Sequence, residues 1–319
     1  MSMKTKSTLC FIACLSFPIF LFAQSGPSDP AYVAKVEAAF EFLKNGDCKN
    51  CLQTYEQAFD LSKHSALSHL RAATCAESCG DMAKRNSLIQ MSVEIAWDVC
   101  LNILASTDNY PEFKPWLGTD FEKIVKAAAQ QQGEAKGINF ALMEELNQLQ
   151  EEDQKYRRML DSVRYEHPEG TPEYQAFITE WIRSDSLNLV WAEKILVEHG
   201  YPGKSMVGVS AAGAIWLVIQ HAPLEKQEQY LPLITEAADK GEILKSNWAL
   251  LIDRIRMRQG KTQLYGSQVV RDEATGQWKL HDIEDEANVN KLRAEAGMEP
   301  LEDYARRFGV EWKPPTGKH

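Results

Sequence analysis

Apolar side chains recur every three or four residues through the N-terminal third of the chain, a pattern typical of amphipathic helices. Val36, Phe40 and Leu43, for example, fall on one face of a helical wheel. The pattern predicts helices over residues 31–44, 48–62, 65–79 and 82–104. Short turns between such helices indicate antiparallel helical hairpins.

The same Gly-Asp turn occurs twice, as Gly46-Asp47 and as Gly80-Asp81, at an interval of 34 residues. That interval is the period of tetratricopeptide repeats, and residues 24–104 resemble such repeats. The resemblance implies a concave surface for a protein or peptide partner. The alternative is a plain pair of helical hairpins that only supports the rest of the chain.

Four cysteines lie at the ends of two consecutive predicted helices, Cys48 and Cys51 at the start of one and Cys75 and Cys79 at the end of the next. In an antiparallel hairpin that turns near Lys63, Cys51 faces Cys75 and Cys48 faces Cys79. The spacing therefore predicts two nested disulfides, Cys48–Cys79 and Cys51–Cys75. A four-cysteine zinc site and a Cys-x-x-Cys redox pair are the alternatives.

Residues 105–137 are predicted as a linker. Pro and Gly, which interrupt regular structure, occur within 106–118, and a run of glutamines at 130–132 is followed by Gly133. Periodicity then resumes as far as residue 312, and a tail follows at 313–319. The expected helices there cover 142–163, 174–199, 207–219, 224–240, 243–259, 289–296 and 301–308, with a β-hairpin between 263–270 and 277–283. We expect a mainly α protein in which tetratricopeptide-like helical hairpins precede a helical domain (138–312) with a small C-terminal β-hairpin.

Polar residues interrupt the apolar faces of two helices in this domain. Asp153 stands on a stripe that includes Leu149, and an ionised carboxylate there needs a partner, for which Arg157 is the nearest candidate. Asp185 and Asn188 interrupt the next helix in the same way. The interruptions indicate either a shared polar pocket or a solvated gap in partly exposed helices.

Five motifs follow one another in the same region. They are Asp153-Gln154-x-x-Arg157, Asp185-x-x-Asn188 with Gly200-Tyr201-Pro202, Gln220-His221-Ala222, Asp253-Arg254 and Gln263-Leu264-Tyr265-Gly266-Ser267-Gln268. In this order they resemble the motifs of an uncharacterised bacterial family of unknown function. The resemblance spans about residues 140–308, and Ser267 keeps the hydroxyl of the threonine that is common in the family. It implies a shared helical fold and a polar site, without naming an activity.

Better-known catalytic motifs are incomplete in this chain. Gly203-Lys204-Ser205 lacks the earlier glycine of a phosphate-binding loop, where Glu198 stands instead. Ser210 lacks the second glycine of a nucleophile elbow, because Ala212 occupies that position. His-Glu-x-x-His does not occur in the sequence. Standard nucleotide-binding, serine-hydrolase and zinc-protease classes are therefore not indicated.

The N-terminus has the layout of a secretory signal peptide. Lys4 and Lys6 precede an apolar run over 8–22 that is followed by Ala23, so we expect cleavage after Ala23. An uncleaved anchor is the alternative, but the run is short for a membrane span. After cleavage no stable membrane span is expected, and a periplasmic or secreted location follows.

Net charge narrows the classes of partner. The full chain carries −10, and losing the leader removes two lysines and no acidic residue, which gives −12. Because phosphate backbones attract clustered Lys and Arg, we expect no nucleic-acid partner.

The leading functional hypothesis is an exported binding or scaffold protein, in which the repeat module contacts a partner and the C-terminal domain holds a ligand. The alternative is a hydrolase with His221 as general base, oriented by Asp153 or Asp253, while Arg157 or Arg254 stabilises negative charge. The residues expected to position a ligand are Asp185, Asn188, Gln220, Gln263, Tyr265 and Gln268. A metal-assisted version uses His221, Asp153, Asp185 and Asp253 as ligands. No cofactor is assigned.

Overall fold

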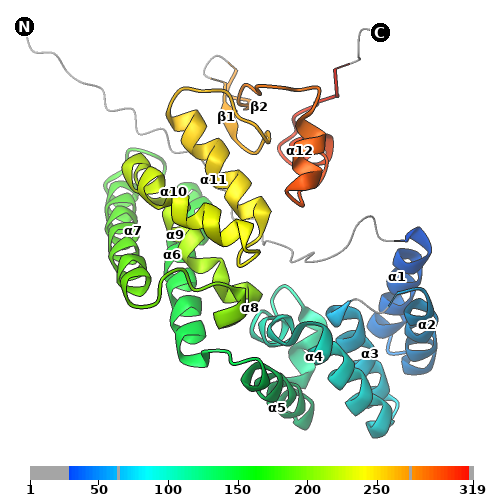
Figure 1. Ribbon diagram of the computed structural model, residues 1–319. Coiled ribbons are helices and arrows are strands. Elements are labelled where there is room, and N and C mark those ends of the chain that lie inside the picture. Colours follow the sequence, from blue (N-terminus) through cyan, green and yellow to red (C-terminus); the bar gives the residue numbers. More distant parts are fainter. Residues whose placement is uncertain (1–28, 63–64, 273–274, 316–319) are drawn as a thin grey trace, which may run out of the picture. The chain divides into compact units, whose positions relative to one another are not determined.

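A computed structural model describes residues 29–62, 65–272 and 275–315 (Figure 1). The predicted signal peptide lies outside the described residues. The protein is mainly helical with one small antiparallel sheet, as predicted. It divides into two compact units. The described part of the N-terminal unit runs to Phe140 and also includes Ser205–Ser210, and the C-terminal unit contains Ala141–Lys204 and the residues from Ala211 onward.

The N-terminal unit is a series of helices that pack on near neighbours in the chain. They are α1 (Pro30–Lys44), α2 (Cys48–Leu61), α3 (Ala66–Ser78), α4 (Met82–Ala105), the 3-10 helix η1 (Pro111–Trp116) and α5 (Asp120–Ala135). The repeated Gly-Asp dipeptide forms the same turn twice. Gly46 and Gly80 have φ of 72° and 76°, and Asp47 and Asp81 then cap α2 and α4 by accepting backbone N–H groups.

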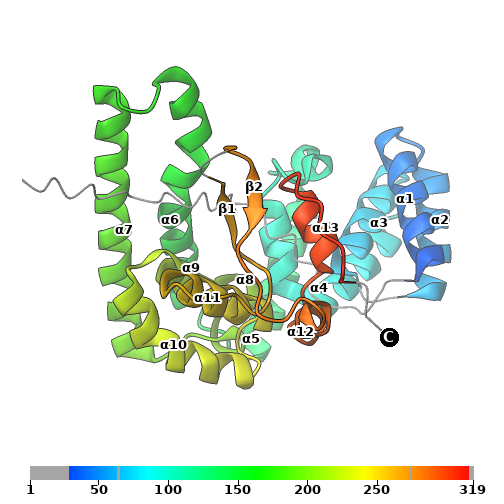
Figure 2. The same cartoon turned by 90° about the horizontal axis from the view of Figure 1, so that it is seen from above.

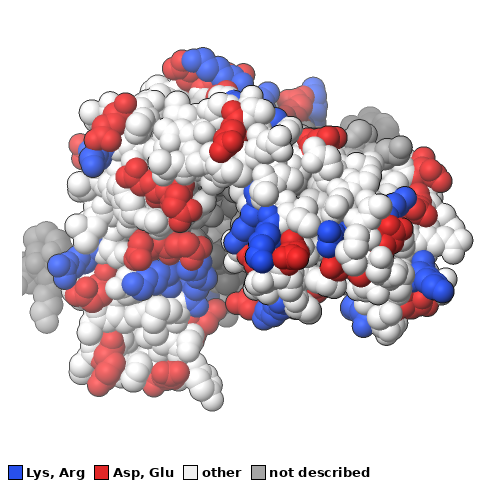
Figure 3. All heavy atoms as spheres, turned by 90° about the horizontal axis from the view of Figure 1, so that it is seen from below, with Lys and Arg blue, Asp and Glu red and all other residues white. Residues whose placement is uncertain are grey.

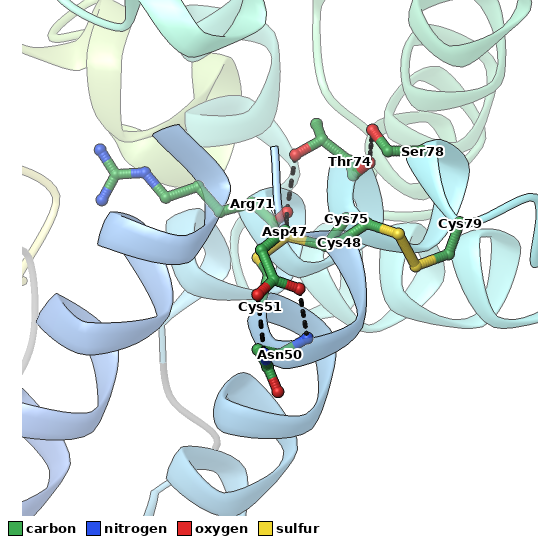
Figure 4. The surroundings of a disulfide bond; sticks show 9 residues. All are labelled: Asp47, Cys48, Asn50, Cys51, Arg71, Thr74, Cys75, Ser78 and Cys79. Atoms are coloured by element: carbon green, nitrogen blue, oxygen red, sulfur yellow. Dashed lines mark hydrogen bonds between the residues drawn. A yellow bond between two sulfur atoms is a disulfide. The ribbon is translucent and has the colours of Figure 1, made fainter. Parts of the chain in front are cut away.

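The two predicted disulfides join the hairpin of α2 and α3, Cys48 to Cys79 and Cys51 to Cys75 (Figure 4). Disulfides are consistent with an extracellular or periplasmic location, where thiols are oxidised. Cys100 on α4 is free and buried, and its burial raises its pKa to about 12.

Residues 105–137 differ from the expected linker, because they contain η1 and α5, and α5 packs against α4. The glutamine run at 130–133 is the last part of a regular helix. Gly133 allows the ring of Phe140 to approach, since a Cβ there would lie 2.4 Å from that ring. The glycine therefore serves packing and does not end the helix.

Helix α4 is long and apolar enough, by length and composition, to cross a membrane, although no span was expected here. Half of the apolar stretch is buried inside the protein, as in a core helix. The helix is also broken at Ala96, whose φ and ψ of −157° and 84° are not helical.

The C-terminal unit is built on two long helices, α6 (Phe140–Glu166) and α7 (Pro172–His199), which lie alongside each other (Figure 2). Aromatic and aliphatic side chains pack between the C-terminal end of α6 and the N-terminal end of α7, around Leu160, Tyr174 and Ile178. The remaining elements are α8 (Lys204–Ala212), α9 (Ala214–His221), α10 (Leu224–Asp239), α11 (Lys245–Arg258), β1 (Val269–Arg271), β2 (Trp278–Leu280), α12 (Val289–Glu295) and α13 (Leu301–Arg306). Helix α9 packs against α7, α10 and α11.

The single helix expected over 207–219 is two helices, α8 and α9, and α8 itself is interrupted at Gly208. Gly208 has φ of 82°, which exposes the backbone N–H groups that follow it. Asp98 of α4 accepts hydrogen bonds from the N–H groups of Val209 and Ser210. This cap comes from a residue far away in the sequence, so local periodicity could not reveal the break.

The β-hairpin is present but shorter than predicted, with Val269 paired to Leu280 and Arg271 to Trp278. Residues 263–268 form a loop in place of a strand.

On the face drawn in Figure 3, acidic and basic side chains are interspersed.

Candidate functional site

Four of the predicted site residues meet within the C-terminal unit. Asp153 and Arg157 are one turn apart on α6, Asp185 lies on α7, and His221 is the last residue of α9. They form a continuous series of contacts from His221 to Asp153, from Asp153 to Arg157, and from Arg157 to Asp185. We call these four residues the polar cluster.

Asp153 holds the imidazole of His221. The Nδ1 atom of His221 lies 3.0 Å from each carboxylate oxygen of Asp153, whose exposed fraction is only 1%. Burial alone would raise the pKa of Asp153, but His221 and Arg157 outweigh burial and hold that pKa below its ordinary value. Because an ionised carboxylate only accepts hydrogen bonds, Nδ1 is the protonated ring nitrogen in this pair. The neutral ring then carries its lone pair on Nε2.

Arg157 and Asp185 form a two-pronged ion pair. Nη1 and Nη2 of Arg157 each lie 2.9 Å from an oxygen of Asp185. Nη1 also donates to the backbone carbonyl of Asp153, and the guanidinium lies 5.4 Å from the centre of the Trp181 ring. The Arg157 side chain is 5% exposed and that of Asp185 is 30% exposed, so Asp185 is the member of the cluster that faces solvent.

The pKa values of the two carboxyl groups move in opposite directions. Burial raises the pKa of Asp185 above its ordinary value, although Arg157 opposes the rise. At Asp153 the contacts with His221 and Arg157 outweigh burial and the pKa falls, whereas at Asp185 burial outweighs the contact with Arg157 and the pKa rises. Neighbouring groups with pKa values driven apart are typical of acid–base sites.

Asp253 has a different environment from the one predicted. Its carboxylate is fully buried and accepts hydrogen bonds from the backbone N–H groups of Leu264, Tyr265 and Ser267 and from the Ser267 hydroxyl, at 2.7–3.1 Å. Burial raises the pKa of Asp253, and these N–H groups oppose the rise. Asp153 is therefore the carboxylate that orients His221, and Asp253 organises the loop.

The glutamines of the same loop also bond to backbone groups. The Gln263 side chain accepts from the N–H of Gln268 at 2.7 Å and donates to the carbonyl of His281 at 2.7 Å. Gln268 donates to the Ser267 hydroxyl at 3.0 Å, and Tyr265 packs its ring against Trp248. The two glutamine side chains therefore hydrogen-bond in and around this loop, and the ligand-positioning roles of Gln263, Tyr265 and Gln268 stay predictions.

Asn188 lies three residues after Asp185 in the sequence, and Gln220 directly precedes His221. Both side chains are buried, with exposed fractions of 4% and 2%. Within the described part of the chain, Nδ2 of Asn188 and Oε1 of Gln220 have no hydrogen-bond partner. Gln227 donates to the backbone carbonyl of Gln220 at 2.7 Å. Buried polar atoms of this kind call for an explanation such as a bound ligand or water. Arg254 is also buried, at 5% exposure.

Two contact residues were not predicted as site residues. Gln154 donates to Asp153 at 2.7 Å, and Trp181 packs against Arg157. Both had a signal in the sequence, since Gln154 belongs to the first shared motif and Trp181 lies one turn before Asp185 on the same stripe.

The predicted set of metal ligands does not assemble. Among residues 29–62, 65–272 and 275–315, no three His, Cys, Asp or Glu side chains are grouped as metal ligands. The physical reason lies in their partners, since Arg157 occupies both oxygens of Asp185 and the loop occupies Asp253.

Comparisons with known proteins agree with the resemblance seen in the motifs. No curated protein and no solved structure matches the chain. The sequence profile of one family matches residues 140–312, more than half of the chain. The chain belongs to this family, which is described as a family of unknown function (DUF6624).

Proposed function

We propose that the C-terminal unit is a hydrolase in which His221 is the general base. One observation supports the proposal, the Asp153 carboxylate placed 3.0 Å from Nδ1 of His221 in a buried setting. A carboxylate at Nδ1 fixes the tautomer in which Nε2 accepts a proton, and it stabilises the imidazolium that forms.

The reaction requires only water as a second reactant. Nε2 of His221 takes a proton from a water molecule while the water oxygen attacks the bond to be cleaved. The imidazolium then returns the proton to the leaving group, so His221 ends each cycle neutral. A positioned general base contributes roughly 10²–10⁴-fold to such a rate.

The test measures hydrolysis of chromogenic carboxylic and phosphoric esters by the mature protein. We expect activity on at least one class, and a loss of about 100-fold or more in His221→Gln. His199→Gln is the matched control, because His199 is also the last residue of a helix but is partly exposed. Activity that His221→Gln leaves intact, or the absence of activity on every ester, would contradict the proposal.

A second candidate function concerns the N-terminal unit, which we propose to be a protein-interaction module of tetratricopeptide type in an exported protein. The recurrence of one Gly-Asp turn at Gly46 and Gly80, with the same cap, favours it. Hydrogen exchange of the mature protein with a bound peptide tests it. Protection of α1–α4 is expected, and protection only in α6–α11 would contradict it.

A further inference from the structure

We propose that the substrate of His221 carries an oxyanion group, a carboxylate or a phosphate, which binds Arg157 in the place that Asp185 now occupies. The inference rests on the hydrolytic function proposed above. It assigns Arg157 as the anion-binding residue, Asp185 as a built-in substitute for the anion, and Asn188 as an additional donor.

Arg157 is held ready for a two-oxygen ligand. The Asp153 carbonyl and the Trp181 ring fix its guanidinium, and its side chain is 5% exposed. Both Nη atoms are directed at one carboxylate at equal distances of 2.9 Å. A planar guanidinium in this arrangement recognises the paired oxygens of carboxylates and phosphates equally well.

Asp185 is suited to leave this position. It comes from a different helix than Arg157, and 30% of its side chain is exposed, so it can turn toward water. Its raised pKa shows that its burial is only partly compensated by Arg157. An incoming anion therefore replaces a carboxylate that gains hydration when it moves away.

Asn188 supplies the second observation. It lies three residues after Asp185 on α7, which places the two side chains on the same face of the helix. Asn188 is 4% exposed, and its Nδ2 has no partner within the described residues. An unsatisfied buried amide donor one turn from Asp185, on the same helix face, fits a third hydrogen bond to an anion.

The position of the anion is compatible with attack by His221. Oδ1 of Asp153 lies 3.4 Å from Nη1 of Arg157 and 3.0 Å from Nδ1 of His221, so one oxygen contacts both side chains. A group bound at Arg157 is consequently linked to the imidazole through the Asp153 carboxylate. The anion would orient the substrate, and His221 would act on a neighbouring bond.

Isothermal titration calorimetry of the mature protein with sodium phosphate and sodium acetate tests the inference at constant ionic strength. Asp185→Asn keeps the shape of the side chain and removes its charge, so we expect at least tenfold tighter binding of one anion than in wild type. Glu180→Gln, an exposed carboxylate on the same helix, is the control and should leave affinity unchanged. Asn188→Ala should weaken binding several-fold in the Asp185→Asn background.

A gain in Asp185→Asn that persists after Arg157→Met, or no gain at all, would overturn the inference. If Asp185→Asn does not fold, Arg157→Lys in the otherwise wild-type chain replaces it, since lysine cannot bind two oxygens side by side. At least tenfold weaker anion binding is then expected, and unchanged binding refutes the inference. Preference for phosphate or for acetate identifies the substrate class.

The two proposals fail separately. Anion binding through Arg157 without any hydrolysis that depends on His221 would refute the proposed function alone. Hydrolysis that depends on His221, without anion binding through Arg157, would refute the anion site alone.

Discussion

Two buried aspartates show how partners decide the behaviour of the same side chain. Asp153 and Asp253 both have exposed fractions of 1% or less. Asp153 faces His221 and Arg157 and its pKa is lowered, whereas Asp253 faces backbone N–H groups and burial raises its pKa. One carboxylate therefore belongs to the polar cluster, and the other holds a loop in place.

Asp153→Asn is expected to lower the free energy of unfolding by about 3–5 kcal/mol near neutral pH, since it removes a buried negative charge that both His221 and Arg157 contact. The folded pKa of Asp153 lies below the unfolded value of about 4, so its ionisation stabilises the fold above that pH. The stabilisation is lost as pH falls through the folded pKa.

Urea denaturation of both proteins between about pH 3 and pH 7 measures this effect. The difference between wild type and Asp153→Asn should shrink below about pH 4. Asp161→Asn, an exposed site on the same helix, should differ little from wild type at any pH. A difference between wild type and Asp153→Asn that stays constant over the whole range would contradict the assignment.

The sequence predicted part of this site for a clear physical reason. An acidic residue on an apolar stripe shows that a partner exists, so Asp153, Arg157 and His221 could be proposed together. The kind of partner is set by the tertiary fold, and a carboxylate that binds backbone N–H groups leaves no pattern of its own. The roles of Asp253 and Gln263 could therefore not be read from the sequence.

At the scale of elements, periodicity predicted helices well and their interruptions poorly. The hairpins of α1–α4 and the disulfides follow from local spacing, since the turns and cysteines lie within the same segment. The break at Gly208 depends on Asp98, more than a hundred residues earlier. Glycine inside an apolar helical pattern carries no information about such a distant cap.

Gly208→Ala is expected to destabilise the protein more than Gly46→Ala does. Both positions have positive φ, 82° and 72°, which costs alanine on the order of 1–3 kcal/mol, and Gly208, with ψ of 166°, lies in a region that is essentially restricted to glycine. A Cβ at Gly208 would also lie 3.1 Å from both Asp98 and Trp97, whereas a Cβ at Gly46 meets nothing within 4 Å. Thermal and urea denaturation compare the two variants, and equal losses of stability would show that the Asp98 contact contributes nothing.

At the scale of the whole molecule, the two units are interleaved along the chain. Ser205–Ser210 packs with the N-terminal unit, while the residues on both sides of it belong to the C-terminal unit. Val207 in this segment is fully buried, and Asp98 bonds to the N–H groups of Val209 and Ser210.

A fragment limited to residues 140–312 is expected to lose the order of this segment, because it lacks Asp98. Hydrogen exchange measures the outcome at the amides of Val209 and Ser210. These amides should be protected in the full chain and exchange rapidly in the fragment. Equal protection in both would show that the segment orders itself without α4.

The break at Gly208 thus has a consequence for how such proteins are cut and recombined. The family region, residues 140–312, contains the six residues Ser205–Ser210, which pack with the N-terminal unit. The boundaries of the family region therefore differ from those of the compact C-terminal unit. If the family region were grafted into another protein, the buried segment around Val207 would lose the N-terminal unit on which it packs.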